Sequence, residues 1–296
     1  MDGLPLIPFG PRATCTLDLC PIEWSVLQYR PSLGSSIAFI CIFSGLLFVH
    51  SFIGARWKSW WFMSCMGVGC ITEILGYGGR VILFYNPFSF AGFMMQIICI
   101  GCAPVFYSAA IYVTIAKVVE NLDPTLSRIK PKLYYVIFIA SDLFSGVLQG
   151  VGGATSTSSN GQSKYAVDLT LAGLSLQVFS MVVFCGLIAD YIIRYSKAGG
   201  NALTSPRLRL FITFLSIAIL LILTRCAYRV AELNEGYQGD LIHDEPLFIG
   251  LEGVVISLAT LALCIGHPGF VFLPSENGLK MSKKTSEENG ILLQRK

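Results

Sequence analysis

Seven apolar runs, each long enough to cross a lipid bilayer as a helix, occupy most of the chain. They cover residues 32–53, 60–84, 90–118, 133–154, 167–193, 208–231 and 247–266. The hydrocarbon core of a bilayer is about 30 Å thick, and a helix of about 20 apolar residues crosses it. The runs lack the alternation of apolar and polar residues that barrel strands show, so helices are the remaining way to satisfy backbone hydrogen bonds in lipid. The sequence therefore predicts an all-α polytopic membrane protein with seven transmembrane helices.

The charge content agrees with this prediction. Only 13% of the 296 residues are charged, whereas soluble proteins average roughly 25%. The net charge is +3, and the basic residues lie in short clusters between the apolar runs. Such a distribution argues against a nucleic-acid partner. Membrane lipids are the expected surroundings.

The loops predict the orientation in the membrane. Fifteen Lys and Arg residues lie in the C-terminal tail and in the connections that follow the first, third and fifth runs, whereas three lie on the opposite side. The positive-inside rule then places the C-terminus in the cytoplasm and the N-terminus outside. We expect an extracellular, exposed N-terminal tail over residues 1–31, a seven-helix domain over 32–269 and a disordered basic cytoplasmic tail over 270–296. The plasma membrane is the expected location, with the vacuole and the endosome as alternatives.

Most of the ten cysteines are expected to pack as small apolar residues and not to bind metal. Eight of them lie inside apolar runs, where cysteine behaves as a small hydrophobic residue. Cys99 and Cys102 have the C-x-x-C spacing, but no second pair and no histidine lies near them, so we expect no metal there. Cys15 and Cys20 differ because they lie in the polar N-terminal tail. They are a candidate disulfide if this tail faces an oxidising space.

Charged side chains interrupt the second run, and each needs a partner or a function. A charge at the centre of a membrane costs about 2.5–3.5 kcal/mol on insertion scales. Glu73, Tyr77 and Arg80 follow one another at spacings of four and three residues, which places them on one face of a helix. Either a structural ion pair between helices or a substrate-facing site explains them. The glycines of this run allow close helix approach or an adjacent cavity.

The third run is interrupted by Gln96 and Tyr112 and contains a proline, Pro104. A proline inside a helix removes a backbone donor, so it predicts a kink and a free carbonyl near the middle of the membrane. Such an interruption forms a binding site in some transporters, and it is a purely structural feature in other proteins.

The later runs also carry polar residues. Asp142 lies near the middle of the fourth run, where a lone carboxylate binds a proton or pairs with a cation. We expect Arg225 and Arg229 of the sixth run to supply that cation. Because most runs contribute a polar residue, we expect a polar cavity at the centre of the bundle. The complete set of candidate substrate-binding residues is Glu73, Tyr77, Arg80, Gln96, Tyr112, Asp142, Gln149, Gln177, Arg225, Arg229, Glu232 and Glu252.

The sequence carries no sign of catalysis. His50 and His267 lie near one side of the membrane and His243 near the other, so they cannot form a zinc site of three histidines. The S-x-x-K, G-x-S-x-G, H-E-x-x-H and Walker motifs are absent from the sequence. We therefore expect neither an enzyme nor an ATP-driven pump, and no cofactor.

Short motifs, in a fixed order along nearly the whole chain, resemble the fungal resistance-to-aminocholesterol-like family, also called lipid-translocating exporters. They include Tyr29-Arg30-Pro31, Glu73-x-x-Gly76-Tyr77-x-x-Arg80, Ala103-Pro104, Asp142-x-x-Ser145-x-x-x-Gln149, Arg225-x-x-x-Arg229-x-x-Glu232 and His267-Pro268-Gly269. Each motif is short, and their order across seven runs is what makes the resemblance specific. The resemblance implies a fungal protein with seven helices and an outside N-terminus. It also implies a role in the transbilayer movement or release of amphipathic lipids, such as sphingoid long-chain bases, or in resistance to toxic amphiphiles.

Two functional hypotheses remain open from the sequence. The first is an exporter of amphipathic small molecules, which would place an amine near Glu73, Asp142 or Glu252 in exchange for a proton and rest its tail on apolar helix faces. The second is a seven-helix lipid sensor, similar to a receptor, that regulates lipid asymmetry. Seven crossings with an outside N-terminus are also the receptor topology, although the cytoplasmic loops here are short. The sequence leaves the oligomeric state undetermined.

Overall fold

The computed structural model describes residues 7, 10, 13–158, 164–198, 206–235 and 239–269. Seven helical segments in it are long and apolar enough to cross a membrane, which confirms the predicted fold class. They are α1 (Leu33–Arg56), α2 (Trp60–Tyr85), α3 (Phe90–Leu122), α4 (Pro131–Ser158), α5 (Lys164–Lys197), α6 (Pro206–Glu235), and a last segment made of α8 (Glu245–Leu247), a π-helix (Phe248–Val254) and α9 (Val255–Ile265). Three short elements complete the described part: η1 (Ile22–Trp24) precedes α1, η2 (Pro124–Leu126) joins α3 to α4, and α7 (Asp240–His243) lies between α6 and α8. The described residues contain no strand.

Most helices extend past the predicted apolar runs. The longest, α5, has 34 residues, which rise about 51 Å at 1.5 Å per residue. Its ends therefore project beyond a hydrocarbon core of about 30 Å. Lys164 lies at one end, and Arg194 and Lys197 lie at the other, and all three are exposed. Apolar content marks the part of a helix inside the lipid and leaves out such charged extensions.

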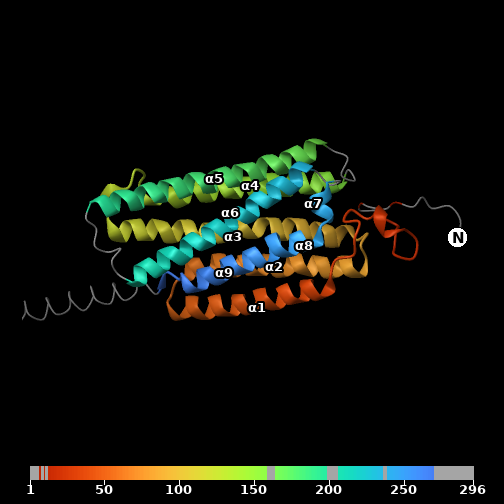
Figure 1. The fold of residues 1–296 in the computed structure, drawn as a ribbon, viewed down its shortest axis with the longest axis horizontal. Coiled ribbons are helices and arrows are strands. Elements are labelled where there is room, and N and C mark those ends of the chain that lie inside the picture. Colours follow the sequence, from red (N-terminus) through yellow and green to blue (C-terminus); the bar gives the residue numbers. More distant parts are fainter. Residues whose placement is uncertain are drawn as a thin grey trace, which may run out of the picture.

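The helices lie side by side along the long axis of the molecule, and α6 crosses the others obliquely (Figure 1). Each of α1 to α5 packs on the next in sequence, α6 packs on α5 and α9, and α9 packs on α1, which closes a ring. Most of α3 is buried, whereas most of α1 is not, so α3 is the central helix. We call the end of the bundle where α1 begins the N-terminal face, and the end where α9 terminates the C-terminal face.

The close approach of α2 and α3 follows from glycine. A methyl group at Gly79 would lie 2.7 Å from the carbonyl oxygen of Gly92 and 2.8 Å from the amide nitrogen of Gln96. Both are backbone atoms of α3, which cannot move aside as a flexible side chain can. Small residues at helix interfaces allow this kind of approach in membranes. Of the two roles that the sequence allows for these glycines, close packing is the one observed at Gly79.

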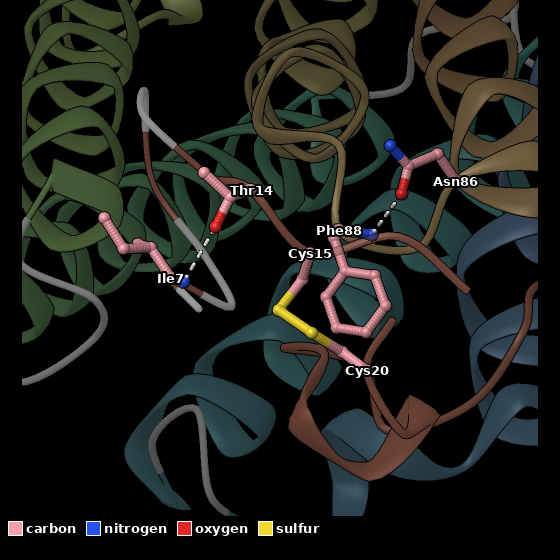
Figure 2. Close-up of a disulfide and its surroundings, with 6 residues drawn as sticks. All are labelled: Ile7, Thr14, Cys15, Cys20, Asn86 and Phe88. Atoms are coloured by element: carbon pink, nitrogen blue, oxygen red, sulfur yellow. Dashed lines mark hydrogen bonds between the residues drawn. A yellow bond between two sulfur atoms is a disulfide. The ribbon is translucent and has the colours of Figure 1, made fainter. Parts of the chain in front are cut away.

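The described part of the N-terminal segment is docked on the bundle through a few buried residues, while others, such as residues 16–19, are exposed as expected. Cys15 and Cys20 form a disulfide that packs against the ring of Phe88, in the connection between α2 and α3 (Figure 2). Leu27 is buried against Leu83 and neighbouring apolar residues of α3. Apolar side chains within this polar segment explain the docking, because they leave water at the N-terminal face. The predicted basic tail over 270–296 lies outside the described residues, as does most of the polar link over 155–163.

Candidate functional site

A buried ion pair joins α6 to the last helical segment at the centre of the bundle. Arg225 donates from its Nε to Oε1 of Glu252 at 3.0 Å. Its Nη2 lies 3.6 Å from Oε1 of Glu73 on α2. All three side chains are at most 1% exposed. Two of the sequence-predicted site residues on different helices, Glu73 and Glu252, thus meet the same guanidinium.

Arg229 and Glu232 extend this cluster along α6. Arg229 donates from Nη1 to Oε2 of Glu232 at 2.6 Å, and its Nε lies 3.7 Å from Oε2 of Glu252. We call the five residues Glu73, Arg225, Arg229, Glu232 and Glu252 the charge network. With every group ionised, it holds three carboxylates and two guanidiniums. The network therefore carries one excess negative charge, and burial makes such a charge costly unless a proton or a cation neutralises it.

The proline of α3 explains part of the position of Arg225. Pro104 has no N–H, so the carbonyl four residues earlier, that of Ile100, has no donor within the helix. The Nη2 of Arg225 donates to that carbonyl oxygen. The free carbonyl predicted from the sequence is therefore occupied by the arginine at the centre of the charge network.

Glu252 lies within a seven-residue π-helix, Phe248–Val254, that continues directly into α9. π-helical turns are rare and frequently occur at functional sites. Gly253 brings this segment against α1, since a methyl group there would overlap the ring of Phe39. The sequence shows the two glycines of this segment, Gly250 and Gly253, but does not reveal the change of helix type.

Arg80 shares the buried face of α2 with Glu73 and Tyr77, but it does not join the charge network. Its Nη2 donates to Oε1 of Glu245 at 2.8 Å, near the N-terminal face. The same carboxylate oxygen accepts from the backbone N–H of Ser32 at 2.7 Å. The Tyr29 hydroxyl lies 3.5 Å from Arg80, and burial raises the pKa of Tyr29 while the arginine acts in the opposite direction.

Glu245 and Tyr29 are absent from the sequence-predicted set of site residues. A carboxylate in the first turn of an apolar run is also explained by the helix dipole, so its position alone gives no reason to assign it a distant arginine. The pair joins residues 165 positions apart in the sequence. It fixes the start of the last helical segment to the end of α2.

Asp142 does not meet an arginine, so the expectation that α6 supplies its cation is wrong. The hydroxyl of Tyr112 donates to Oδ2 of Asp142 at 2.8 Å, and no Lys or Arg of the described residues lies within 4.0 Å of this carboxylate. Arg225 and Arg229 instead face the carboxylates of the charge network. Helix packing separates the two groups, because α4 contacts α3 and α5, whereas α6 packs on α5 and α9.

An amide pair lies between α4 and α5. Gln149 donates from Nε2 to Oε1 of Gln177 at 2.9 Å and to the hydroxyl of Ser145 at 2.9 Å. Ser145 in turn donates to the carbonyl of Gly173 at 2.6 Å. Gln177 is 1% exposed, and its own Nε2 has no hydrogen-bond partner among the described residues. This buried donor is available to a ligand.

A partly enclosed pocket of about 760 Å³, a volume that includes its open side, lies between α3, α4, α5 and α6 in the half nearer the N-terminal face. We call it the polar pocket. Its polar and charged lining comes from Gln149, Thr170, Gln177, Arg225, Arg229 and Glu232, and its larger apolar lining from Ile97, Ile98, Leu174, Leu233 and Ile242. Thr170 is absent from the sequence-predicted set. Its hydroxyl donates to a backbone carbonyl of its own helix, which is a common structural role.

The structure thus divides the twelve predicted site residues into two groups. Five line the polar pocket: Gln149, Gln177, Arg225, Arg229 and Glu232. The other seven are buried without lining it: Glu73, Tyr77, Arg80, Gln96, Tyr112, Asp142 and Glu252. Among the described residues that line the pocket, Glu232 is the one carboxylate. It is therefore the acidic group that a ligand in this pocket meets first.

His50 and His267 lie near the C-terminal face, away from the polar pocket. His267 is fully buried, and its Nδ1 accepts a hydrogen bond from the N–H of Gly269 at 3.0 Å. Its Nε2 lies 3.1 Å from the hydroxyl of Ser59. Burial lowers the pKa of His267 to about 4, so the ring is neutral. Within the described part of the chain, no group of three or more His, Cys, Asp or Glu residues is placed to hold a metal ion.

Comparisons with known proteins match most of the chain. The family described as RTA1 like protein matches residues 66–275. The sphingoid long-chain base transporter RSB1 of Saccharomyces cerevisiae is 30% identical over 279 residues, which cover 82% of this chain and 73% of that protein. Protein RTM1 of the same yeast is 24% identical over 82% of this chain and 92% of its own length. Protoporphyrin uptake protein 1, also from this yeast, is 27% identical over 67% of this chain and 66% of its own. No solved structure matches the chain.

Proposed function

We propose that this chain, which belongs to the RTA1-like family as its motifs predicted, is a carrier that moves amphipathic lipids with a basic headgroup across the membrane. Sphingoid long-chain bases are the proposed substrates, and the N-terminal face is proposed to lie outside the cell. The observation that carries this proposal is the polar pocket, which adjoins a charge network with one excess negative charge. The relative named as a sphingoid long-chain base transporter supports the substrate class.

The chemistry of the pocket fits an amino alcohol with an alkyl chain. The ammonium group meets Glu232, and the hydroxyl groups meet the amides of Gln149 and Gln177, including the free Nε2 donor of Gln177. The chain rests on apolar lining residues such as Ile98 and Leu174. A pocket that is mostly apolar with a few placed polar groups is typical of small-molecule sites.

A bound ammonium also supplies the positive charge that the charge network lacks. When the pocket is empty, a proton on one of the three carboxylates provides the same neutralisation. Arg229 couples the ammonium in the pocket to the proton in the interior, because it contacts both Glu232 at the pocket and Glu252 in the interior. We therefore propose that substrate and proton move in opposite directions, which makes the carrier an antiporter.

The test uses the full chain reconstituted in liposomes with a labelled sphingoid base. We expect protein-dependent movement of the label that accelerates under a pH gradient of one sign and slows under the opposite sign. Glu232→Gln is expected to abolish the response to the gradient, because it removes the pocket carboxylate and leaves the network with balanced charges. Thr224→Val is the matched control on α6, since Thr224 is exposed and bonds only within its own helix.

The same preparation separates the carrier from the sensor. Binding of the labelled base without movement, in protein that is folded, would favour a lipid sensor and contradict a carrier. Movement that ignores the pH gradient would retain the carrier and refute proton exchange. In cells, we propose that the chain acts at the plasma membrane and confers resistance to toxic amphiphiles, which deletion of the gene should reverse.

A further inference from the structure

A second cavity lies in the other half of the bundle and has a different character. It is partly open, has a volume of about 520 Å³ with its open side included, and lies between α3, α5 and α6 in the half nearer the C-terminal face. Its walls are aliphatic and aromatic, including Ile115 and Val119 of α3, Ile188 of α5, and Leu215 of α6. None of the described residues that line it carries a charge. We call it the apolar pocket.

Both pockets lie on the same seam of three helices. On α5, Leu174 and Gln177 line the polar pocket, and Ile188 lines the apolar pocket. Positions 174, 177, 181, 184 and 188 recur every three or four residues, so they form one stripe along the helix. On α6, which runs in the opposite direction, Ile219 lines the apolar pocket and Cys226 the polar pocket. The two cavities are therefore stacked end to end along one path.

Four side chains at the level between the pockets interrupt this path. They are Tyr112 of α3, Met181 and Phe184 of α5, and Ile222 of α6, and each is at most 1% exposed. We call them the constriction. The rings of Tyr112 and Phe184 meet edge to face with their centroids 4.5 Å apart, and the Tyr112 hydroxyl lies 3.9 Å from the sulfur of Met181.

The two sides of the constriction differ in how firmly they are held. Tyr112 is fixed to α4 by its hydrogen bond to Asp142. Met181, Phe184 and Ile222 have no polar group that could form a strong hydrogen bond, so packing alone positions them. Methionine is flexible and adapts to irregular space. The α5 and α6 side of the constriction is therefore the side that can move aside.

We propose that the polar pocket and the apolar pocket are the two ends of one path for a single alkyl chain, and that the constriction is its gate. The headgroup occupies the polar pocket while the chain passes Phe184 and ends in the apolar pocket. The identity of the headgroup rests on the proposed function, whereas the path itself rests on the cavities.

The dimensions of the path match one lipid chain. The eleven residue steps from Gln177 to Ile188 rise about 16.5 Å along a helix. A hydrocarbon core about 30 Å thick gives each leaflet, and thus one chain, a depth of about 15 Å. An amphiphile with a full-length chain therefore reaches the apolar pocket, whereas one with half that length ends at the constriction.

The experiment places a bulky ring in the apolar pocket without touching the polar pocket. Ser216 lines the apolar pocket from an exposed position on α6, so Ser216→Trp is expected to fold. Ile217→Trp is the matched control, because this neighbour is 42% exposed and does not line the cavity. Both variants are reconstituted as full chains and compared for movement of a long-chain sphingoid base and for binding of an analogue with half the chain length.

We expect Ser216→Trp to reduce long-chain movement to the rate of protein-free liposomes while it binds the short analogue as tightly as wild type. Ile217→Trp should behave as wild type in both assays. If long-chain movement survives Ser216→Trp, and its response to the pH gradient is still lost in Glu232→Gln, the path is overturned and the proposed function is left intact.

A second measurement tests the path even if no movement is detected. A sphingoid base with a photoreactive group at the end of its chain is expected to label the segments 188–195 and 211–219, which line the apolar pocket. Labelling confined to residues of the polar pocket, or to exposed positions on α1, would overturn the proposal. Labelling of the apolar pocket without any transport would support the path and contradict the carrier function.

Discussion

The charge network predicts that removing Arg225 destabilises the protein far more than removing Glu73, although both side chains are fully buried and face each other. Arg225→Met keeps a long, flexible apolar side chain in place but leaves Glu73 and Glu252 without their shared guanidinium. The excess negative charge of the network then rises from one to two. Breaking a buried ion pair by removing one partner costs about 3–5 kcal/mol. Glu73→Gln instead removes the excess charge and leaves two carboxylates with two guanidiniums.

The expected free energies of unfolding follow from this balance. Arg225→Met should lose about 3–5 kcal/mol, and the unpaired carbonyl of Ile100 places the loss at the upper end of that range. At about 2–4 °C per kcal/mol, this lowers the melting temperature by roughly 6–20 °C. Glu73→Gln should remain within about 1 kcal/mol of wild type. The double variant Arg225→Met/Glu252→Gln restores the original excess of one charge, so it should recover much of the loss.

The assay is thermal unfolding of the purified protein in detergent near neutral pH, followed by tryptophan fluorescence. The double-mutant cycle gives the coupling between Arg225 and Glu252, which for residues in contact is about 0.5–3 kcal/mol. The reasoning is refuted if Glu73→Gln destabilises the protein as much as Arg225→Met does. It is also refuted if the double variant is no more stable than Arg225→Met alone.

Three further predictions concern a close helix contact, a second ion pair and a buried histidine. Gly79→Ala should lower the free energy of unfolding by about 1–3 kcal/mol, because the new methyl group meets backbone atoms of α3, whereas Gly45→Ala, with no atom within 4 Å, should not be less stable than wild type. Glu245→Gln leaves Arg80 buried without its carboxylate, so we expect a loss of about 1–3 kcal/mol and faster amide exchange where α1 begins; unchanged exchange would contradict the role of this pair. The pKa of His267 is about 4 in the folded chain, below its ordinary value of 6.5, so the unfolded chain binds the proton more tightly and stability falls as the pH drops from about 6.5 toward 4. Between pH 7 and pH 5, the melting temperature of His267→Gln should therefore fall less than that of wild type, and equal slopes would show that this ring does not titrate as described.

The seven helices are predictable from sequence because the bilayer sets their length independently of their partners. The ends are less predictable, as α5 shows, because Lys164 and Lys197 belong to the helix but not to its apolar run. The docking of the N-terminal segment is also missed. The few apolar residues of this segment are too scattered to predict a helix or a strand. Their role as docking residues is visible only in the folded structure, where Leu27 contacts Leu83.

The site is predictable in its residue types but not in its pairing. Spacing on a helix shows that Arg225, Arg229 and Glu232 share a face, and it shows the same for Asp142 and Gln149. It does not show which faces meet. The sequence therefore predicts an arginine beside Asp142, whereas in the structure a tyrosine of the neighbouring α3 donates to one of its two carboxylate oxygens. Partner choice depends on the order of the helices around the ring, and one-dimensional periodicity does not contain that order.

Backbone irregularity explains why the charge network lies where it does. Membrane helices tolerate unpaired backbone groups only where neighbours satisfy them. Pro104 creates such a group on α3, and Arg225 satisfies it from α6. The π-helix that holds Glu252 is a second irregularity, and it faces the same guanidinium. An arginine whose donors serve both a carbonyl and a carboxylate holds α3, α6 and the last helical segment together at one point, beside the polar pocket. A regular α3 with Ala in place of Pro104 would return the Ile100 carbonyl to its own helix, so Arg225 would be held by carboxylates alone and would follow their protonation more freely.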